Sequence, residues 1–323
     1  MTGRNLDYVQ RVREAEADRG LYHLYLRAIW IALVGNTLLA LVKGGLAWLS
    51  GSTAVLATAV DSATDLVYTL FMALGLWRSQ QPADEDHPQG HARIEPLISI
   101  IIGLMMGLAG WEVVKRAVSQ LRADAGPVSY TAWSVAILLG SGLVKLAMYF
   151  LVRRLAQRIH SPAIAATARD NLADFVSSGT ALVGVLVAGW LHPLADPAAA
   201  LLVSVWIFRN AVAILQENLG YLVGRAPAED LVARVHAAAM GVEGVVDVHR
   251  IVTDYVGPRV RVELHVDLPG EMTVSAAHDV SERVAAAVEA LDEVDQVFVH
   301  LEPEHQRPWS RDGHGDSPPR PGA

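Results

Sequence analysis

Residues 54–77 read AVLATAVDSATDLVYTLFMALGLW, an almost entirely apolar run that nevertheless contains two aspartates. A helix needs roughly 20 mostly apolar residues to cross the hydrocarbon core of a bilayer, and this run is long enough. Asp61 and Asp65 stand one helical turn apart, so a helix places both carboxylates on one face. The stretch therefore predicts a transmembrane helix that carries a pair of carboxylates into the membrane.

The composition of the whole chain favours a membrane part followed by a soluble part. Of 323 residues, 52% are hydrophobic and only 19% are charged, whereas soluble domains carry about 25% charge. The long apolar stretches lie within residues 28–223, and the sequence from residue 227 resembles that of a soluble domain. The absence of cysteine excludes disulfides and thiolate metal sites. A net charge of -8 gives no support for nucleic-acid binding.

Five further segments have the length and apolar character of spanning helices, which gives six in all. Arginines before the first span and the cluster Arg153, Arg154 and Arg158 place both termini in the cytoplasm, although Lys115 and Arg116 oppose this orientation. The polar N-terminal segment, residues 1–27, lacks the apolar core of a signal peptide. The predicted spans are about 28–49, 54–77, 94–114, 131–151, 164–190 and 197–215.

The C-terminal part, residues 227–305, has the pattern helix–strand–strand–helix–strand. This order predicts a small α+β domain whose sheet is covered on one face. The tail, residues 306–323, is rich in proline, glycine and charge, and we expect it to be disordered. The fold class is thus a six-helix all-α membrane domain followed by an α+β domain.

A second carboxylate pair, Asp170 and Asp174, repeats the one-turn spacing in the fifth predicted span. Each carboxylate at the centre of a spanning helix costs about 2.5–3.5 kcal/mol, and neighbouring like charges add repulsion. A divalent cation bound by Asp61, Asp65, Asp170 and Asp174 offsets this cost, because hard oxygen ligands suit such ions. Helix capping and a proton relay without metal are the alternatives.

Two groups outside the spans also have metal-ligand character. Asp84, His87 and His91 lie in the loop between the second and third spans, where a two-histidine, one-carboxylate set suits a metal and a solvated polar loop is the alternative. In the soluble domain, strand alternation puts His300 and Glu302 on one face. The second candidate group comprises His249, His265, His278, His300 and Glu302. The alternative is that these are ordinary polar residues of the domain surface.

Three single charges lie inside predicted spans: Lys43, Lys145 and Arg209. Such residues either pair with carboxylates or extend to the membrane interface. The sequence does not decide between these two outcomes, so we assign them no role.

These motifs together resemble the cation diffusion facilitator family of divalent metal/proton antiporters. The resemblance extends from about residue 29 to residue 305. It is carried by GSTAVLATAVDSATDLV, DHPQGHARIE, ARDNLADFVSSG, VGPRVRVELHV and VFVHLEP in that order.

The resemblance implies a homodimer in the cell inner membrane, with a cytoplasmic ferredoxin-like (metallochaperone-like) domain that pairs across the two-fold axis. It implies no enzymatic activity and no cofactor beyond metal ions. By the same resemblance, the transmembrane aspartates match the transport site, Asp84, His87 and His91 match a loop site, and His249, His265, His278, His300 and Glu302 match a regulatory metal cluster.

Three departures from the family pattern concern metal choice and domain coupling. Zinc-type members usually carry histidine at the position of Asp170, so the all-aspartate site resembles the manganese type, whereas the cytoplasmic histidines resemble the zinc and iron types. Glu302 stands where aspartate is common. Arg93 matches the basic partner of a charge interlock, but its acidic position is Gly224, unless Glu217 substitutes.

The sequence therefore predicts proton-coupled efflux of manganese, iron or zinc by alternating access, with cobalt and cadmium as further candidates. A membrane-anchored metal sensor without transport is the alternative from a different class. A proton-coupled carrier of an organic cation is less consistent with the sequence, because the carboxylate site lacks aromatic walls.

Overall fold

The computed structural model describes residues 19–50, 53–81, 84–122, 132–188 and 195–304. The chain divides into two compact units, Met1–Val223 and Gly224–Ala323. Most of the predicted N-terminal segment 1–27 and the whole predicted tail 306–323 lie outside the described residues, so those two expectations stay predictions.

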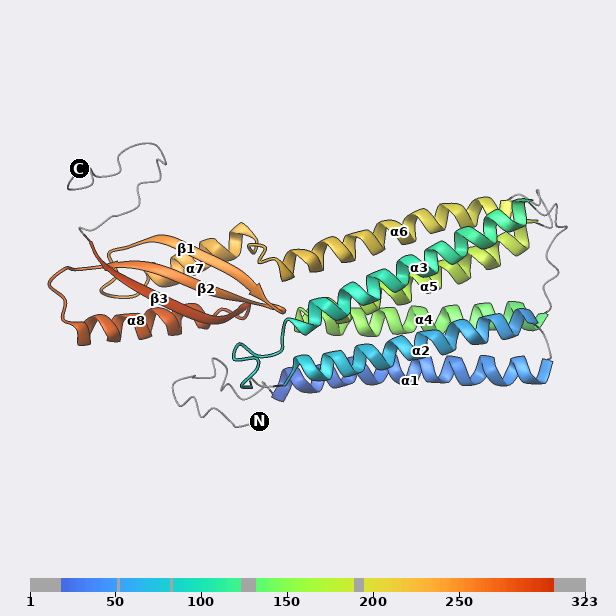
Figure 1. Cartoon of the computed structure of the whole chain (residues 1–323), viewed down its shortest axis with the longest axis horizontal. Coiled ribbons are helices and arrows are strands. Elements are labelled where there is room, and N and C mark those ends of the chain that lie inside the picture. The colour runs from blue at the N-terminus through green and yellow to red at the C-terminus, as the bar shows by residue number, and fades with distance from the viewer. Residues whose placement is uncertain (1–18, 51–52, 82–83, 123–131, 189–194, 305–323) are drawn as a thin grey trace, which may run out of the picture. The chain divides into compact units, whose positions relative to one another are not determined.

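The first unit is a bundle of six long helices (Figure 1). Five of them are long and apolar enough to cross a membrane in the part of the chain that the structure describes; α5, which carries Asp170 and Asp174, is not among the five. The predicted all-α membrane domain is confirmed. The helices are α1 (Arg19–Ser50), α2 (Thr53–Ser79), α3 (Ile94–Arg122), α4 (Ala132–Ile159), α5 (Pro162–Ala188) and α6 (Ala195–Leu222).

Several helices extend beyond the apolar segments that predicted them. Helix α4 continues to Ile159, past the predicted end near residue 151, and its last two turns contain Arg153, Arg154 and Arg158. Arginine is a good helix former, so the helix continues after the apolar segment has ended. Hydropathy locates the part of a helix that suits lipid and does not locate the helix ends.

Small residues allow the helices of the bundle to approach closely. Helix α3 packs along α6, where a methyl group on Gly103 would lie 3.1 Å from Ile214 Cγ2 and one on Gly110 would lie 3.1 Å from Ile207 Cγ2. Close backbone approach at small residues is a main source of helix association in membranes. Helix α4 packs on α5, and α1 packs on α2 and α4.

The second unit is the predicted α+β domain. Its three-stranded sheet has the order β1-β2-β3, with β1 and β2 antiparallel and β2 and β3 parallel. The apolar positions of β2, including Val262, Leu264 and Val266, pack in one core with Val235 of α7 and Val284 of α8. The elements are α7 (Glu229–Met240), β1 (Asp247–Val256), β2 (Arg259–Leu268), α8 (Val274–Glu289) and β3 (Val294–Pro303).

Candidate metal sites

Two of the four transmembrane aspartates meet at a buried lysine. Lys145 of α4 places its Nζ 2.8 Å from Asp65 Oδ2 on α2 and 2.7 Å from Asp174 Oδ2 on α5. Only 4% of Lys145 is exposed. One ammonium group therefore joins carboxylates from two helices that are far apart in the sequence, one from each predicted pair.

The other member of each pair has different surroundings. Asp61 Oδ1 lies 3.7 Å from Arg116 Nη2 of α3, and both side chains are more than half exposed. Asp170 lines a cavity beside Asp65. Within the described residues, three-membered groups of metal-ligand side chains occur in the loop and in the C-terminal domain, and the four aspartates form no such group. The structure thus brings Asp65 and Asp174 to one cation but does not assemble all four carboxylates into one cage.

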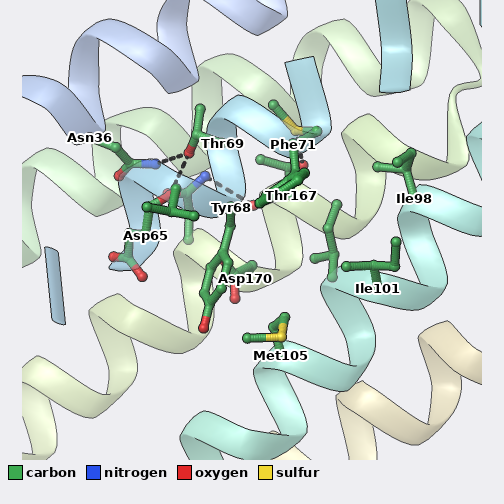
Figure 2. Close-up of a pocket in the computed structure, with 14 residues that line it drawn as sticks. Asn36, Asp65, Tyr68, Thr69, Phe71, Ile98, Ile101, Met105, Thr167 and Asp170 are labelled. Carbon is green, nitrogen blue, oxygen red and sulfur yellow. Dashed lines mark hydrogen bonds between the residues drawn. The ribbon is translucent and has the colours of Figure 1, made fainter. Parts of the chain in front are cut away.

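The cavity beside Asp65 and Asp170 has a volume of about 390 Å³ and is bounded by α1, α2, α3 and α5 (Figure 2). Asn36 Nδ2 donates to Thr69 Oγ1 at 2.7 Å, and that hydroxyl donates to the backbone carbonyl of Asp65 at 2.8 Å. These bonds tie α1 to the turn of α2 that carries Asp65. Tyr68 and Phe71 also line the cavity, and Tyr68 lies beside Asp170. The sequence had led us to expect a carboxylate site without aromatic walls.

The three residues of the loop site are close together, as their spacing predicts. Asp84 Oδ1 lies 3.1 Å from His87 Nδ1, and Asp84 Oδ2 lies 3.2 Å from His91 Nε2. Partial desolvation opposes ionisation of Asp84, but bonds from the His87 backbone N–H and the Arg78 guanidinium outweigh it and lower the pKa of Asp84 to about 2. The ligand atoms of Asp84, His87 and His91 lie within 4.8 Å of one another, so this donor set fits a divalent metal ion.

The cluster predicted for the C-terminal domain is built by strand register. In the parallel pairing of β2 and β3, His265 stands opposite His300 and Asp267 stands opposite Glu302. His265 Nδ1 lies 2.8 Å from Glu302 Oε1, and His249 Nε2 lies 3.8 Å from Glu302 Oε2. The hydrogen bond with His265 lowers the pKa of Glu302, although partial desolvation opposes the shift.

The donor atoms of this cluster also fit a divalent metal ion. Ligand atoms of His249, His265 and Glu302 lie within 4.8 Å of one another. His300 Nε2 lies 3.5 Å from Glu302 Oε1, with 61% of its side chain exposed. A mixed imidazole and carboxylate set of this kind suits zinc, iron and related transition metals.

His278 does not join the cluster within one chain. It lies on α8, the helix whose apolar residues Val280, Val284 and Val288 pack against the opposite face of the sheet, and it is exposed. Its assignment as a regulatory ligand stays a prediction.

Two family models match the chain over almost its whole described length. The model of the cation efflux transmembrane domain matches residues 29–223, and that of the cation efflux protein cytoplasmic domain matches residues 227–304. The chain belongs to the cation diffusion facilitator family. It is therefore a multi-pass membrane protein of a metal-efflux family, with the helical domain and the ferredoxin-like domain that the sequence predicted.

Three relatives illustrate the range of this cation diffusion facilitator family. The uncharacterized transporter MJ0449 of Methanocaldococcus jannaschii is 30% identical over 84% of this chain and 96% of its own length. The magnetosome protein MamM of Paramagnetospirillum magneticum is 30% identical over 80% of this chain and 82% of its own length. The manganese efflux system protein MneS of Bacillus subtilis is 28% identical over 86% of this chain and 95% of its own length.

Two residues of this cation diffusion facilitator chain join the candidate sites without having been predicted there. Lys145 was visible in the sequence as a charge inside a span, but its partners could not be identified. Asp267 is 2% exposed, and its Oδ1 lies 3.0 Å from His249 Nδ1. Strand alternation from His265 would have placed Asp267 on the cluster face. A carboxylate against the second imidazole nitrogen orients a histidine ligand.

Glu217, which could substitute for the acidic residue of the charge interlock, is paired inside the helical bundle. Arg169 Nη1 of α5 lies 2.8 Å from Glu217 Oε2 of α6. Gly224 has a φ of +77°, a left-handed conformation that glycine adopts without a steric penalty. The backbone conformation supplies a reason for glycine, rather than an acidic residue, at this position.

Proposed function

We propose that this protein exports divalent metal ions from the cytoplasm in exchange for protons, with Asp61, Asp65, Asp170 and Asp174 as its transport site. The observation that carries the proposal is the shared cation: Asp65 and Asp174, from different helices, hold one buried ammonium between them. Carboxylates arranged to hold a positive charge in the bundle interior are suited to a transported cation.

Alternating access then follows from competition at the carboxylates. Deprotonated aspartates facing the cytoplasm bind the metal, and on the outer side protons compete for the same oxygens, because bound metal and bound proton exclude one another. Movement of α2 relative to α4 and α5 would change the separation of Asp65 and Asp174, and with it the affinity for metal. In this proposal, a transmembrane domain at residues 28–223 carries out transport and a C-terminal domain at residues 227–305 regulates it.

Manganese is the metal that the transport site favours on chemical grounds. All four proposed ligands are carboxylates, and hard oxygen ligands suit manganese better than zinc. The family relative named as a manganese efflux system agrees with this choice. Iron and zinc are the next candidates, because the cytoplasmic cluster contains imidazole ligands.

We assign the cytoplasmic cluster a regulatory role in a homodimer of the inner membrane with both termini in the cytoplasm. His249, His265 and Glu302 already lie at ligand distances from one another. The cluster is on the sheet face opposite the packed helices, where Phe298 is also 44% exposed. Metal bound on this face would reduce repulsion between carboxylates when two domains pair there.

The test is metal flux into sealed vesicles containing the purified full chain, with an imposed pH gradient and a panel of manganese, iron, cobalt, zinc and cadmium. The proposal predicts flux that stops when the gradient is collapsed, is greatest for manganese, and is lost in Asp65→Asn. Metal binding without flux would support a sensor instead. Undiminished flux in Asp65→Asn would contradict the four-aspartate site.

A further inference from the structure

Lys145 has an unusual position for a charged residue of a spanning helix. It lies in the middle of α4, only 4% exposed, with its ammonium between the carboxylates of Asp65 and Asp174 at 2.8 and 2.7 Å. Intramembrane lysines usually extend to the interface or pair with carboxylates, and Lys145 does the second. It therefore occupies the position that a transported cation would need.

The lysine and a metal ion cannot use the same oxygens at the same time. A divalent ion requires carboxylate oxygens at about 2.0–2.6 Å, and an ammonium bound to those oxygens would be repelled by the ion. Lysine has a flexible four-carbon stem that can withdraw without movement of the backbone.

We infer that Lys145 is a tethered counter-cation that competes with the transported metal for Asp65 and Asp174, and so sets the affinity of the transport site. The inference rests on the proposed function, because it takes these two aspartates as metal ligands. A divalent ion brings two positive charges to the carboxylates in place of the single charge of Lys145. A monovalent ion brings no more charge than the lysine already supplies. Lys145 thus weakens metal binding, helps release, and disfavours sodium and potassium.

A purely structural role for Lys145 makes a different prediction. If the ammonium only braces α2, α4 and α5, its removal weakens the bundle and leaves metal affinity unchanged or lower. If it competes with metal, a neutral side chain of similar length makes metal binding tighter. The sign of the affinity change therefore separates the two roles.

The experiment measures the equilibrium binding of Mn²⁺ to the full chain in detergent at one fixed pH. The parent protein carries His87→Ala, His249→Ala and His265→Ala, so that the loop and cytoplasmic sites do not contribute. The inference predicts that Lys145→Met binds Mn²⁺ at least about tenfold more tightly than this parent. Lys145→Arg, which keeps the charge, should bind close to the parent affinity.

Asp65→Asn in the same parent separates this inference from the proposed function. Loss of binding in Asp65→Asn together with unchanged or weaker binding in Lys145→Met overturns the role of Lys145 and leaves the transport site intact. Binding in Asp65→Asn at the parent affinity overturns the transport site itself. Should Lys145→Met fail to elute as a folded protein, Lys145→Gln replaces it. A Lys145→Arg variant that binds more than about tenfold more tightly than the parent also overturns the inference.

Discussion

The transmembrane and cytoplasmic sites hold carboxylates in two different ways. In the helical bundle, Asp65 and Asp174, whose side chains are 26% and 34% exposed, are paired with the buried Lys145. On the cytoplasmic sheet, Glu302 lies against His265, and both side chains are partly exposed. The transmembrane site has a resident positive charge that a metal must displace, whereas the sheet cluster presents ligands that can bind a metal directly.

The difference follows from the surroundings of each site. In a bundle that crosses the membrane, opposite charges attract strongly and an unpaired charge is costly, so Asp65 and Asp174 need either a cation or bound protons. On the sheet face, the partners of Glu302 are imidazoles, which can be neutral. The comparison indicates exchangeable binding in the helical bundle and longer-lasting binding at the sheet cluster.

The largest expected effect comes from removing both carboxylates that hold Lys145. Asp65→Ala combined with Asp174→Ala leaves a buried, unpaired ammonium, and breaking such a pair costs about 3–5 kcal/mol. We expect a large fall in the thermal unfolding temperature of the detergent-solubilised protein. Adding Lys145→Met should restore much of the stability without restoring transport.

Asp61→Ala is the matched control for this change, because the Asp61 side chain is 59% exposed and its partner Arg116 is more than half exposed. Its unfolding temperature should stay near that of the wild type. If the double variant were as stable as the wild type, Lys145 would not depend on these two carboxylates.

On the cytoplasmic side, Asp267→Asn should weaken metal binding without abolishing it. Asp267 is proposed to orient His249, and loss of such a supporting carboxylate typically lowers metal affinity about 10- to 100-fold. Titration of the full chain with Zn²⁺ measures this effect. Glu271→Gln, on the surface of the same domain, is the control, and equal affinities for the two variants would remove Asp267 from the site.

The metal preference of the transmembrane site can be shifted with one substitution. Asp170→His replaces a hard oxygen ligand with imidazole, which favours zinc over manganese. We expect the ratio of zinc to manganese flux in vesicles to rise about tenfold, equivalent to about 1.4 kcal/mol. An unchanged ratio would locate selectivity outside the aspartates.

The loop site should have the smallest effect on transport. His87 is exposed, and the pair of Asp84 with Arg78 at 3.1 Å does not depend on it. We expect His87→Ala to lower manganese flux by only about two- to fivefold, because it removes one ligand outside the proposed pathway. His236→Ala, an exposed histidine on α7, is the control, and complete loss of flux in His87→Ala would place the loop site on the transport path.

Much of the architecture could be predicted from local patterns. Apolar segments located the six helices, although the described part of α5 is less apolar than the other five. Alternation located the three strands, because both properties are local in sequence. The helix ends were less predictable: α1 begins at Arg19 rather than near residue 28, since helical structure continues where the apolar character stops.

The partners within each site were harder to predict because they depend on packing. One-turn spacing placed Asp61 with Asp65 on a helix face, but the structure directs Asp61 to Arg116 and Asp65 to Lys145. Lys145 is 80 residues from Asp65 in sequence, and no periodicity relates them. The parallel pairing of β2 with β3, which sets His265 beside His300, likewise requires the fold.

The most direct test of the two-site account measures binding and flux on the same preparations of the full chain. Wild type, Asp174→Asn and His265→Ala are compared for manganese flux in vesicles and for bound metal per subunit. The account predicts that Asp174→Asn loses flux but still binds metal at the cytoplasmic cluster, whereas His265→Ala loses that bound metal and keeps substantial flux. Substantial flux in Asp174→Asn, or complete loss of flux in His265→Ala, would contradict it.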